Sequence, residues 1–206
     1  MGGIGHGQES CGFASIIQAQ HGKPRLGLIW MKAGCAGEPK LAAQEARMSY
    51  TVYIDTSIIK LLTTPPSCDP ITRACQQLTR RWWSSQREPE MSYSSHYVNS
   101  EIMADEPLLA ENRLLLSAQN KFLPEDNAID SLAELLVCGG GLRSSAQIEA
   151  RHIACAAINR LDILVTWNCT DIANPFNFRL MRMLVRSHEL RLPELVTPFE
   201  LLEHKL

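Results

Sequence analysis

The spacing of apolar positions predicts a helix followed by a buried strand in the second half of the chain. Apolar residues recur at helical spacing from Ala150 to Leu161, and 163–165 is a short apolar run typical of a buried strand. Glu149 opens the helix, and the polar stretch T-W-N at 166–168 directly follows the strand. In an open α/β sheet the chemistry gathers beyond the carboxyl ends of the strands, so site residues are expected at 166–168.

A second strand with a polar end is predicted at 50–54, where the sequence Y-T-V-Y-I is β-branched and aromatic. Asp55 follows it directly. A carboxylate at the end of a central strand is costly to bury unless a cation or hydrogen bonds satisfy it. Asp55 is therefore a candidate site residue.

The rest of the pattern continues the alternation of helices and strands, which favours an α/β fold. The expected helices are 71–83, 102–118 with a break at Pro107, 129–137, 176–187 and a last one from Pro198, and the expected strands are 95–99, 121–123 and 195–197. The glycines at 139–141 indicate the end of helix 129–137. Ser144 and Ser145 are expected to cap the helix that begins near Glu149.

Glu101 is a further acidic candidate, and its position allows two interpretations. It follows Ser100 after the strand-like stretch H-Y-V-N. Ser100 could be a helix N-cap and Glu101 could simply favour the helix dipole. Taken alone, this structural interpretation is as well supported as a functional one.

Composition fits one soluble domain. The chain has 206 residues, 45% hydrophobic and 20% charged, and no apolar run approaches the ~18–20 residues that a membrane span needs. Its seven cysteines form no C-x-x-C pair. Their number is odd, and Cys155 and Cys169 lie in elements expected to be buried, which favours a reduced, cytoplasmic setting over a disulfide framework.

The first 47 residues differ from the rest, because they hold nine of the twelve glycines and show little periodicity. We expect 1–47 to be a disordered leader or the result of a start codon called too early, with the domain at 48–203. From Met48 onward, 15 Lys or Arg stand against 19 Asp or Glu. That balance is not typical of proteins that bind nucleic acid through bulk charge.

Several short segments together resemble the PIN-domain ribonucleases, and more closely the VapC-like toxins of bacterial toxin–antitoxin pairs. They are Y-I-D-T-S at 53–57, V-N-S-E-I-M at 98–103, E-A-R-H-I-A at 149–154 and L-V-T-W-N-C-T-D-I-A-N at 164–174. The resemblance runs from about Met48 to about Glu203, and the order and spacing of the segments make it specific. It implies a three-layer, PIN-like α/β fold with a central, mostly parallel sheet flanked by helices.

The resemblance also implies a metal site for phosphodiester hydrolysis, with Mg²⁺ or Mn²⁺ held by acidic or amide residues. The implied residues are Asp55, Glu101, Glu149 and Asn168, with Ser57 and Thr166 as hydroxyl support. Hard divalent cations take oxygen ligands, and a bound metal activates water and neutralises charge on the phosphate. His152 and Asp171 are weaker candidates. A lone histidine is more often a satisfied core residue, and the resembling proteins usually have a histidine or another polar residue at the position of Asp171.

Glu149 departs from the family pattern, which has an aspartate in a D-x-x-H-I-A-like motif. The extra methylene moves the carboxylate by roughly a bond length, and Mg²⁺ demands near-ideal octahedral geometry at ~2.0–2.1 Å. A misplacement of ~1 Å in a catalytic site can cost ~100-fold in rate.

Three hypotheses follow. The first is a metal-dependent ribonuclease that acts on RNA as a toxin, pairs into a homodimer and binds an antitoxin protein. The second is a PIN fold whose cleavage has lapsed and which binds RNA or a protein, and Glu149 is the residue that supports it. The third, an unrelated nucleotide-binding α/β protein, is disfavoured because no predicted strand is followed by a glycine-rich phosphate loop.

Overall fold

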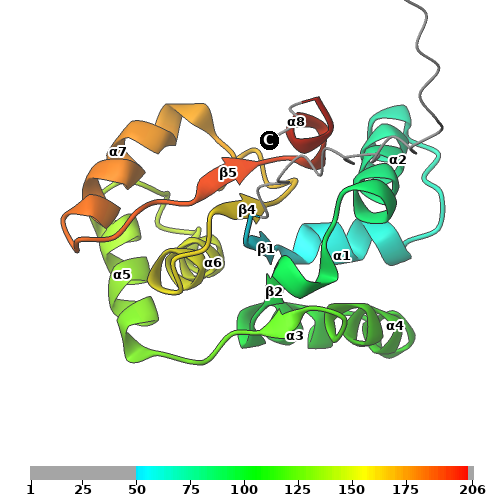
Figure 1. Ribbon diagram of the computed structural model, residues 1–206, viewed down its shortest axis with the longest axis horizontal. Coiled ribbons are helices and arrows are strands. Elements are labelled where there is room, and N and C mark those ends of the chain that lie inside the picture. Colours follow the sequence, from blue (N-terminus) through cyan, green and yellow to red (C-terminus); the bar gives the residue numbers. More distant parts are fainter. Residues whose placement is uncertain (1–49, 204–206) are drawn as a thin grey trace, which may run out of the picture. The chain divides into compact units, whose positions relative to one another are not determined.

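The computed structural model describes residues 50–203, which form an α/β domain around a five-stranded parallel sheet (Figure 1). The strands are β1 (Val52–Ile54), β2 (Ser92–Ser94), β3 (Lys121–Phe122), β4 (Ile163–Val165) and β5 (Glu194–Val196). Their order across the sheet is β3-β2-β1-β4-β5, and each neighbouring pair is parallel. The chain moves outward from β1 to β3 and then returns to β4, so the strand order reverses between β1 and β4.

Helices make the crossover connections that parallel strands require. They are α1 (Thr56–Thr63), α2 (Pro70–Ser85), α3 (His96–Met103), α4 (Pro107–Ser117), α5 (Asn127–Cys138), α6 (Gln147–Ile158), α7 (Pro175–Arg186) and α8 (Pro198–Glu203). Figure 1 shows α1, α2 and α4 on one side of the sheet and α5, α6 and α7 on the other. The predicted three-layer α/β class with a mostly parallel sheet is therefore confirmed.

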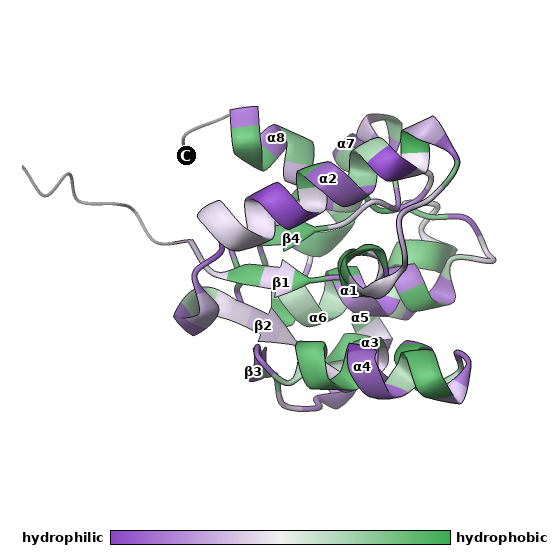
Figure 2. Cartoon of the chain, turned by 90° about the vertical axis from the view of Figure 1, so that its right-hand side faces the viewer, coloured by the Kyte–Doolittle hydropathy of each residue, from purple (hydrophilic) through white to green (hydrophobic). Residues whose placement is uncertain are grey.

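The two central strands are buried because helices cover both faces of the sheet. Ile54, Leu164 and Val165 are fully buried, and β4 is continuously hydrophobic in Figure 2. The outer strand β3 is only two residues long, and both of them are exposed. A site at the end of β1 or β4 thus stands on the most rigidly packed part of the sheet.

In the connection from α5 to α6, the glycines end α5 as predicted, but the N-cap of α6 differs from the predicted one. α5 ends at Cys138, and Gly140 has a positive φ of 76°, a left-handed conformation that glycine adopts without strain. The N-cap position of α6 is Ala146, which makes no side-chain cap bond. The prediction that Ser144 or Ser145 caps α6 is wrong, because the helix starts later, at Gln147. The turn before it is closed by a hydrogen bond from the Ala146 N–H to the Arg143 carbonyl.

The segment 95–99 was expected to be a strand and is instead the start of α3, so this prediction is wrong. The strand lies just before it, where Ser92 pairs with Val52 and Tyr93 with Tyr53. Serine and tyrosine occur in both stretches, so residue type alone does not place the boundary. Because α3 begins at His96, Glu101 lies in its second half, and the interpretation of Glu101 as a residue of the helix N-terminus is also wrong.

The predictions for 1–47, and for a domain start at Met48, lie outside the described residues. Within 50–203, no helix combines the length and the apolarity needed to cross a membrane. The cysteines in this part of the chain are free thiols, at positions 68, 75, 138, 155 and 169. Cys155 is buried as expected, whereas Cys169 is exposed because it lies in the loop after β4.

Candidate metal centre

Asp55 links β1 to α1, and its carboxylate is oriented by hydroxyl groups. Asp55 is the N-cap of α1. Its Oδ2 accepts hydrogen bonds from the backbone N–H of Ser57 at 3.2 Å and from Ser57 Oγ at 2.5 Å. Oδ2 also accepts a bond from Thr166 Oγ1 at 2.7 Å. Thr166 follows β4, the strand paired with β1. These bonds all use Oδ2 and leave Oδ1 directed toward His152, whose Nε2 lies 3.8 Å away.

Glu101 and His152 reach the same point from α3 and α6. His152 Nε2 and Glu101 Oε2 lie 2.7 Å apart, and Thr56 Oγ1 donates a further hydrogen bond to Oε2. Each of Asp55, Glu101 and His152 offers one ligand atom, and these atoms all lie within 4.8 Å of one another. Two carboxylates and an imidazole therefore converge in a group that could hold a metal ion.

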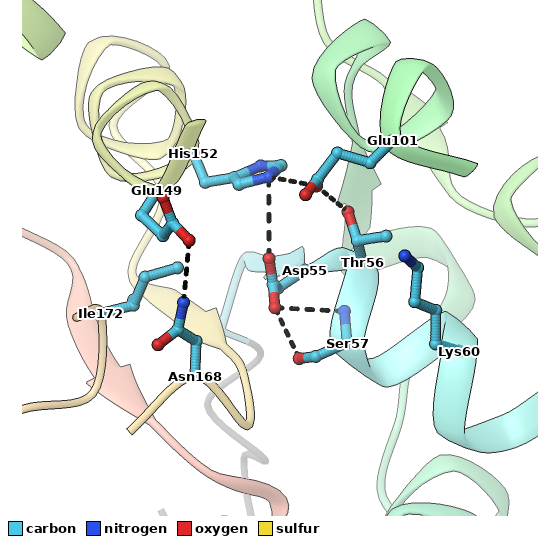
Figure 3. A pocket seen from close by; sticks show the side chains of 9 residues that line it. All are labelled: Asp55, Thr56, Ser57, Lys60, Glu101, Glu149, His152, Asn168 and Ile172. Carbon is cyan, nitrogen blue, oxygen red and sulfur yellow. Dashed lines mark hydrogen bonds and ion pairs between the residues drawn. The ribbon is translucent and has the colours of Figure 1, made fainter. Parts of the chain in front are cut away.

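The three side chains open into a cavity of about 170 Å³ at the carboxyl ends of β1 and β4 (Figure 3). Ligands of open α/β sheets bind in the crevice where the strand order reverses, which is the place between these two strands. The cavity is lined by Asp55, Thr56, Ser57, Lys60, Glu101, Glu149, His152, Asn168 and Ile172.

Glu149 and Asn168 face each other across another part of the same cavity (Figure 3). Asn168 Oδ1 accepts the backbone N–H of Asp171 at 3.0 Å, which fixes the orientation of the amide. Its Nδ2 then donates to Glu149 Oε1 at 3.2 Å. In this conformation Asn168 presents a donor to the cavity, and Glu149 lies outside the close group of ligand atoms. Their role as metal ligands stays a prediction.

Asp171 is buried and engaged elsewhere. Its two oxygens accept hydrogen bonds from Arg143 Nε at 2.6 Å and Arg143 Nη2 at 2.7 Å, a bidentate ion pair. Asp171 does not line the cavity. This ion pair ties the α5–α6 connection to the segment after β4, and so it supports the positions of Glu149 and Asn168.

The pKa values of Glu101 and His152 shift in opposite directions. Burial raises the pKa of Glu101, but hydrogen bonds and charge from His152, with help from Thr56 and Lys60, outweigh it and hold this pKa below its usual range. Burial lowers the pKa of His152, yet the hydrogen bond to Glu101 and the charge of Asp55 raise it above its usual range. Both shifts arise largely from the contact between these two side chains.

Sequence reasoning missed several residues of this site. Thr56 binds Glu101, and Lys60 lines the cavity and donates to Asp105 Oδ1 at 3.1 Å. Lys60 lies one helical turn after Thr56, a spacing that puts both near one face of α1 and was a usable signal. Tyr53, which binds His152 from beneath, had no sequence signal beyond its place in a buried strand.

No protein-family model matches this chain, and no curated protein matches it. Among solved structures, it is similar to a chain of a toxin-antitoxin complex from Klebsiella pneumoniae, with 18% sequence identity and a TM-score of 0.44. The similarity covers 61% of this chain and 93% of that chain. What the cavity can do is therefore inferred from its own side chains.

Proposed function

We propose that this protein is a metal-dependent ribonuclease of the PIN-domain, VapC-like type, which hydrolyses RNA phosphodiester bonds in the cavity at Asp55. One observation carries the proposal. The segments 53–57, 98–103, 149–154 and 164–174 lie far apart in the sequence, and each contributes a polar side chain to this one cavity. A chance match of short motifs would not bring all of them together.

The donor set fits a divalent cation that prefers oxygen. Asp55 Oδ1 and the Glu101 carboxylate face the same space, and such oxygens are ligands of Mg²⁺ and Mn²⁺. When bound, the metal supplies an activated water and neutralises charge on the phosphate. We assign Asp55, Glu101 and Glu149 to metal binding, and Asn168 to orienting Glu149 or a water.

Other side chains in and beside the cavity orient Asp55 or can bind a phosphate. Ser57 and Thr166 fix the Asp55 carboxylate by binding its Oδ2, so that it needs no reorientation during the reaction. Lys60 brings an ammonium group to the cavity, where it can pair with a phosphate oxygen. Glu149, beside Asn168, is the third carboxylate of the cavity.

The test of this proposal is the metal requirement of RNA cleavage. Purified protein incubated with end-labelled RNA should cleave it in Mg²⁺ or Mn²⁺, stop in excess chelator, and resume when the metal is restored. Cleavage that continues unchanged in chelator would exclude the proposed mechanism.

We further propose that the protein is the toxin of a toxin–antitoxin pair, forms a homodimer and binds an antitoxin. The resemblance of its segments to VapC-like toxins supports the pair. Exposed apolar side chains support a protein interface: Met103 of α3 and Leu108 and Leu115 of α4 are 62%, 76% and 66% exposed. Leu108 and Leu115 are seven residues apart and share one helical face.

A second candidate function, a PIN-like module that binds but does not cleave, is favoured by the state of Glu149. Its side chain is one methylene longer than the aspartate of the family pattern, and its carboxylate is bound by the Asn168 amide. In that case metal and RNA would still bind, and no condition would give cleavage products.

A further inference from the structure

The imidazole of His152 is held from behind by a buried chain of hydroxyl groups. Tyr53 Oη lies 2.8 Å from His152 Nδ1 and 2.6 Å from Ser95 Oγ. Tyr53 is fully buried, and His152 and Ser95 are each 1% exposed. Such a chain fixes the plane of the ring and directs Nε2 at Asp55 and Glu101.

The distances from Nε2 fit those between ligands of one metal ion. Nε2 lies 2.7 Å from Glu101 Oε2 and 3.8 Å from Asp55 Oδ1. Two donors bound to one octahedral ion at ~2.1 Å lie about 3 Å apart when adjacent and about 4 Å apart when opposite. His152 Nε2 is thus already spaced from each carboxylate as ligands of a shared cation are.

Hydrogen bonding gives Tyr53 a defined part in such a site. A histidine that binds metal through Nε2 must carry its proton on Nδ1, and that proton needs an acceptor. Tyr53 Oη is the atom within reach of Nδ1. It can accept a hydrogen bond from Nδ1–H and donate its own O–H to Ser95 Oγ.

We propose that His152 is a nitrogen ligand of the metal centre, that Tyr53 and Ser95 are positioning residues which hold it in the Nδ1-protonated form, and that the site consequently prefers Mn²⁺ or Co²⁺ to Mg²⁺. This inference rests on the proposed function only for the existence of a metal site. Imidazole binds first-row transition ions well, whereas Mg²⁺ keeps to oxygen ligands. Carboxylates alone would bind Mg²⁺ and Mn²⁺ alike. An added imidazole therefore favours the transition ions over Mg²⁺.

The test is metal binding by the full chain, without RNA. Pulsed electron paramagnetic resonance of bound Mn²⁺ should show coupling to one imidazole ¹⁴N, and calorimetry should give tighter binding of Co²⁺ and Mn²⁺ than of Mg²⁺. His152→Gln should remove the nitrogen coupling. Tyr53→Phe, which keeps the ring and deletes the acceptor, should weaken Mn²⁺ binding by about 10- to 100-fold and leave Mg²⁺ binding unchanged.

Tyr97→Phe is the matched control. The Tyr97 ring lies edge-on to His152, 6.4 Å between ring centroids, but its hydroxyl makes no hydrogen bond to that histidine. It should bind both ions as the unaltered protein does. If Tyr53 only supported the fold, Tyr53→Phe would lower the melting temperature and weaken the binding of Mn²⁺ and Mg²⁺ alike.

The outcomes separate this inference from the proposed function. Bound Mn²⁺ without nitrogen coupling, or equal Mn²⁺ affinity in Tyr53→Phe, would overturn the inference even if RNA is cleaved. Nitrogen-coupled Mn²⁺ in a protein that cleaves no RNA would uphold it and refute the ribonuclease proposal.

Discussion

At the level of single residues, the imidazole of His152 lies beside two carboxylates. Its Nε2 contacts Glu101 and faces Asp55, both of which raise its pKa. If His152 binds metal as proposed, metal and proton compete for the same nitrogen, because a metal ligand must be deprotonated.

This arrangement predicts a pH-dependent stability of the metal-free protein. A raised folded pKa of His152 stabilises the fold fully below the unfolded value of ~6.5, and this stabilisation is lost as pH rises through the folded pKa. The lowered pKa of Glu101 acts at the other end, since its stabilisation is present above ~4.3 and is lost as pH falls through the folded pKa.

The melting temperature in chelator should accordingly fall as pH rises above ~6.5. His152→Gln should reduce this fall, because it removes the imidazole whose pKa the fold raises. Differential scanning fluorimetry over a pH series measures both proteins. Parallel curves for the two would contradict the assigned role of His152.

Glu149 gives a second prediction at this scale. If its longer side chain holds the carboxylate away from the ligand position, Glu149→Asp should raise the cleavage rate by about tenfold, equivalent to ~1.4 kcal/mol of barrier. Initial rates in Mn²⁺ and in Mg²⁺ provide the measurement. A slower Glu149→Asp enzyme would mean that α6 is already placed for the glutamate.

At the level of elements, the positions of α3 and α6 decide which side chains meet. The motif residues could be picked from the sequence because Asp55 and Thr166 directly follow strands with clear apolar patterns. The start of α3 could not, since nothing in the sequence of 92–99 marks where the strand ends. The strand β2, which pairs with β1, ends at Ser94. The contact of Glu101 with His152 depends on that boundary and was not predictable.

The turn between α5 and α6 gives a stability prediction. Gly140 has φ of 76° and open space at the position of a Cβ. Gly140→Ala should lower the free energy of unfolding by about 1 kcal/mol, because alanine in a left-handed conformation is strained. Gly140→Asn should cost less, since asparagine tolerates this region. Urea denaturation that ranks the two variants in the reverse order would contradict the backbone explanation.

At the level of the whole molecule, the alternating pattern was enough to predict the α/β class, and the crossover rules of parallel sheets account for the layers. The strand order was not predictable, and it is this order that brings the ends of β1 and β4 together. The contacts at the site follow from this strand order: Thr166 reaches Asp55 across 111 positions of sequence. The same tertiary packing places Lys60 at the cavity and Tyr53 against His152.

The proposed homodimer is tested on the exposed face of α4. Leu108→Asp with Leu115→Asp should convert a dimer to a monomer, because charges in a buried apolar interface are costly. Phe176→Asp is the matched control, since Phe176 is 95% exposed on α7, away from this face. Light scattering that reports a monomer for the unaltered protein, or a dimer for the double variant, would contradict this interface.

The proposal that Asp55 binds a metal required for RNA cleavage is tested most directly by the single-turnover cleavage rate of Asp55→Asn in saturating Mn²⁺. Asp130→Asn is the control, because Asp130 makes only a surface ion pair with Arg151. Asp55→Asn is expected to lower the rate by about 100-fold or more, while its melting temperature stays near that of the control. Equal rates for Asp55→Asn, Asp130→Asn and the unaltered protein would contradict it.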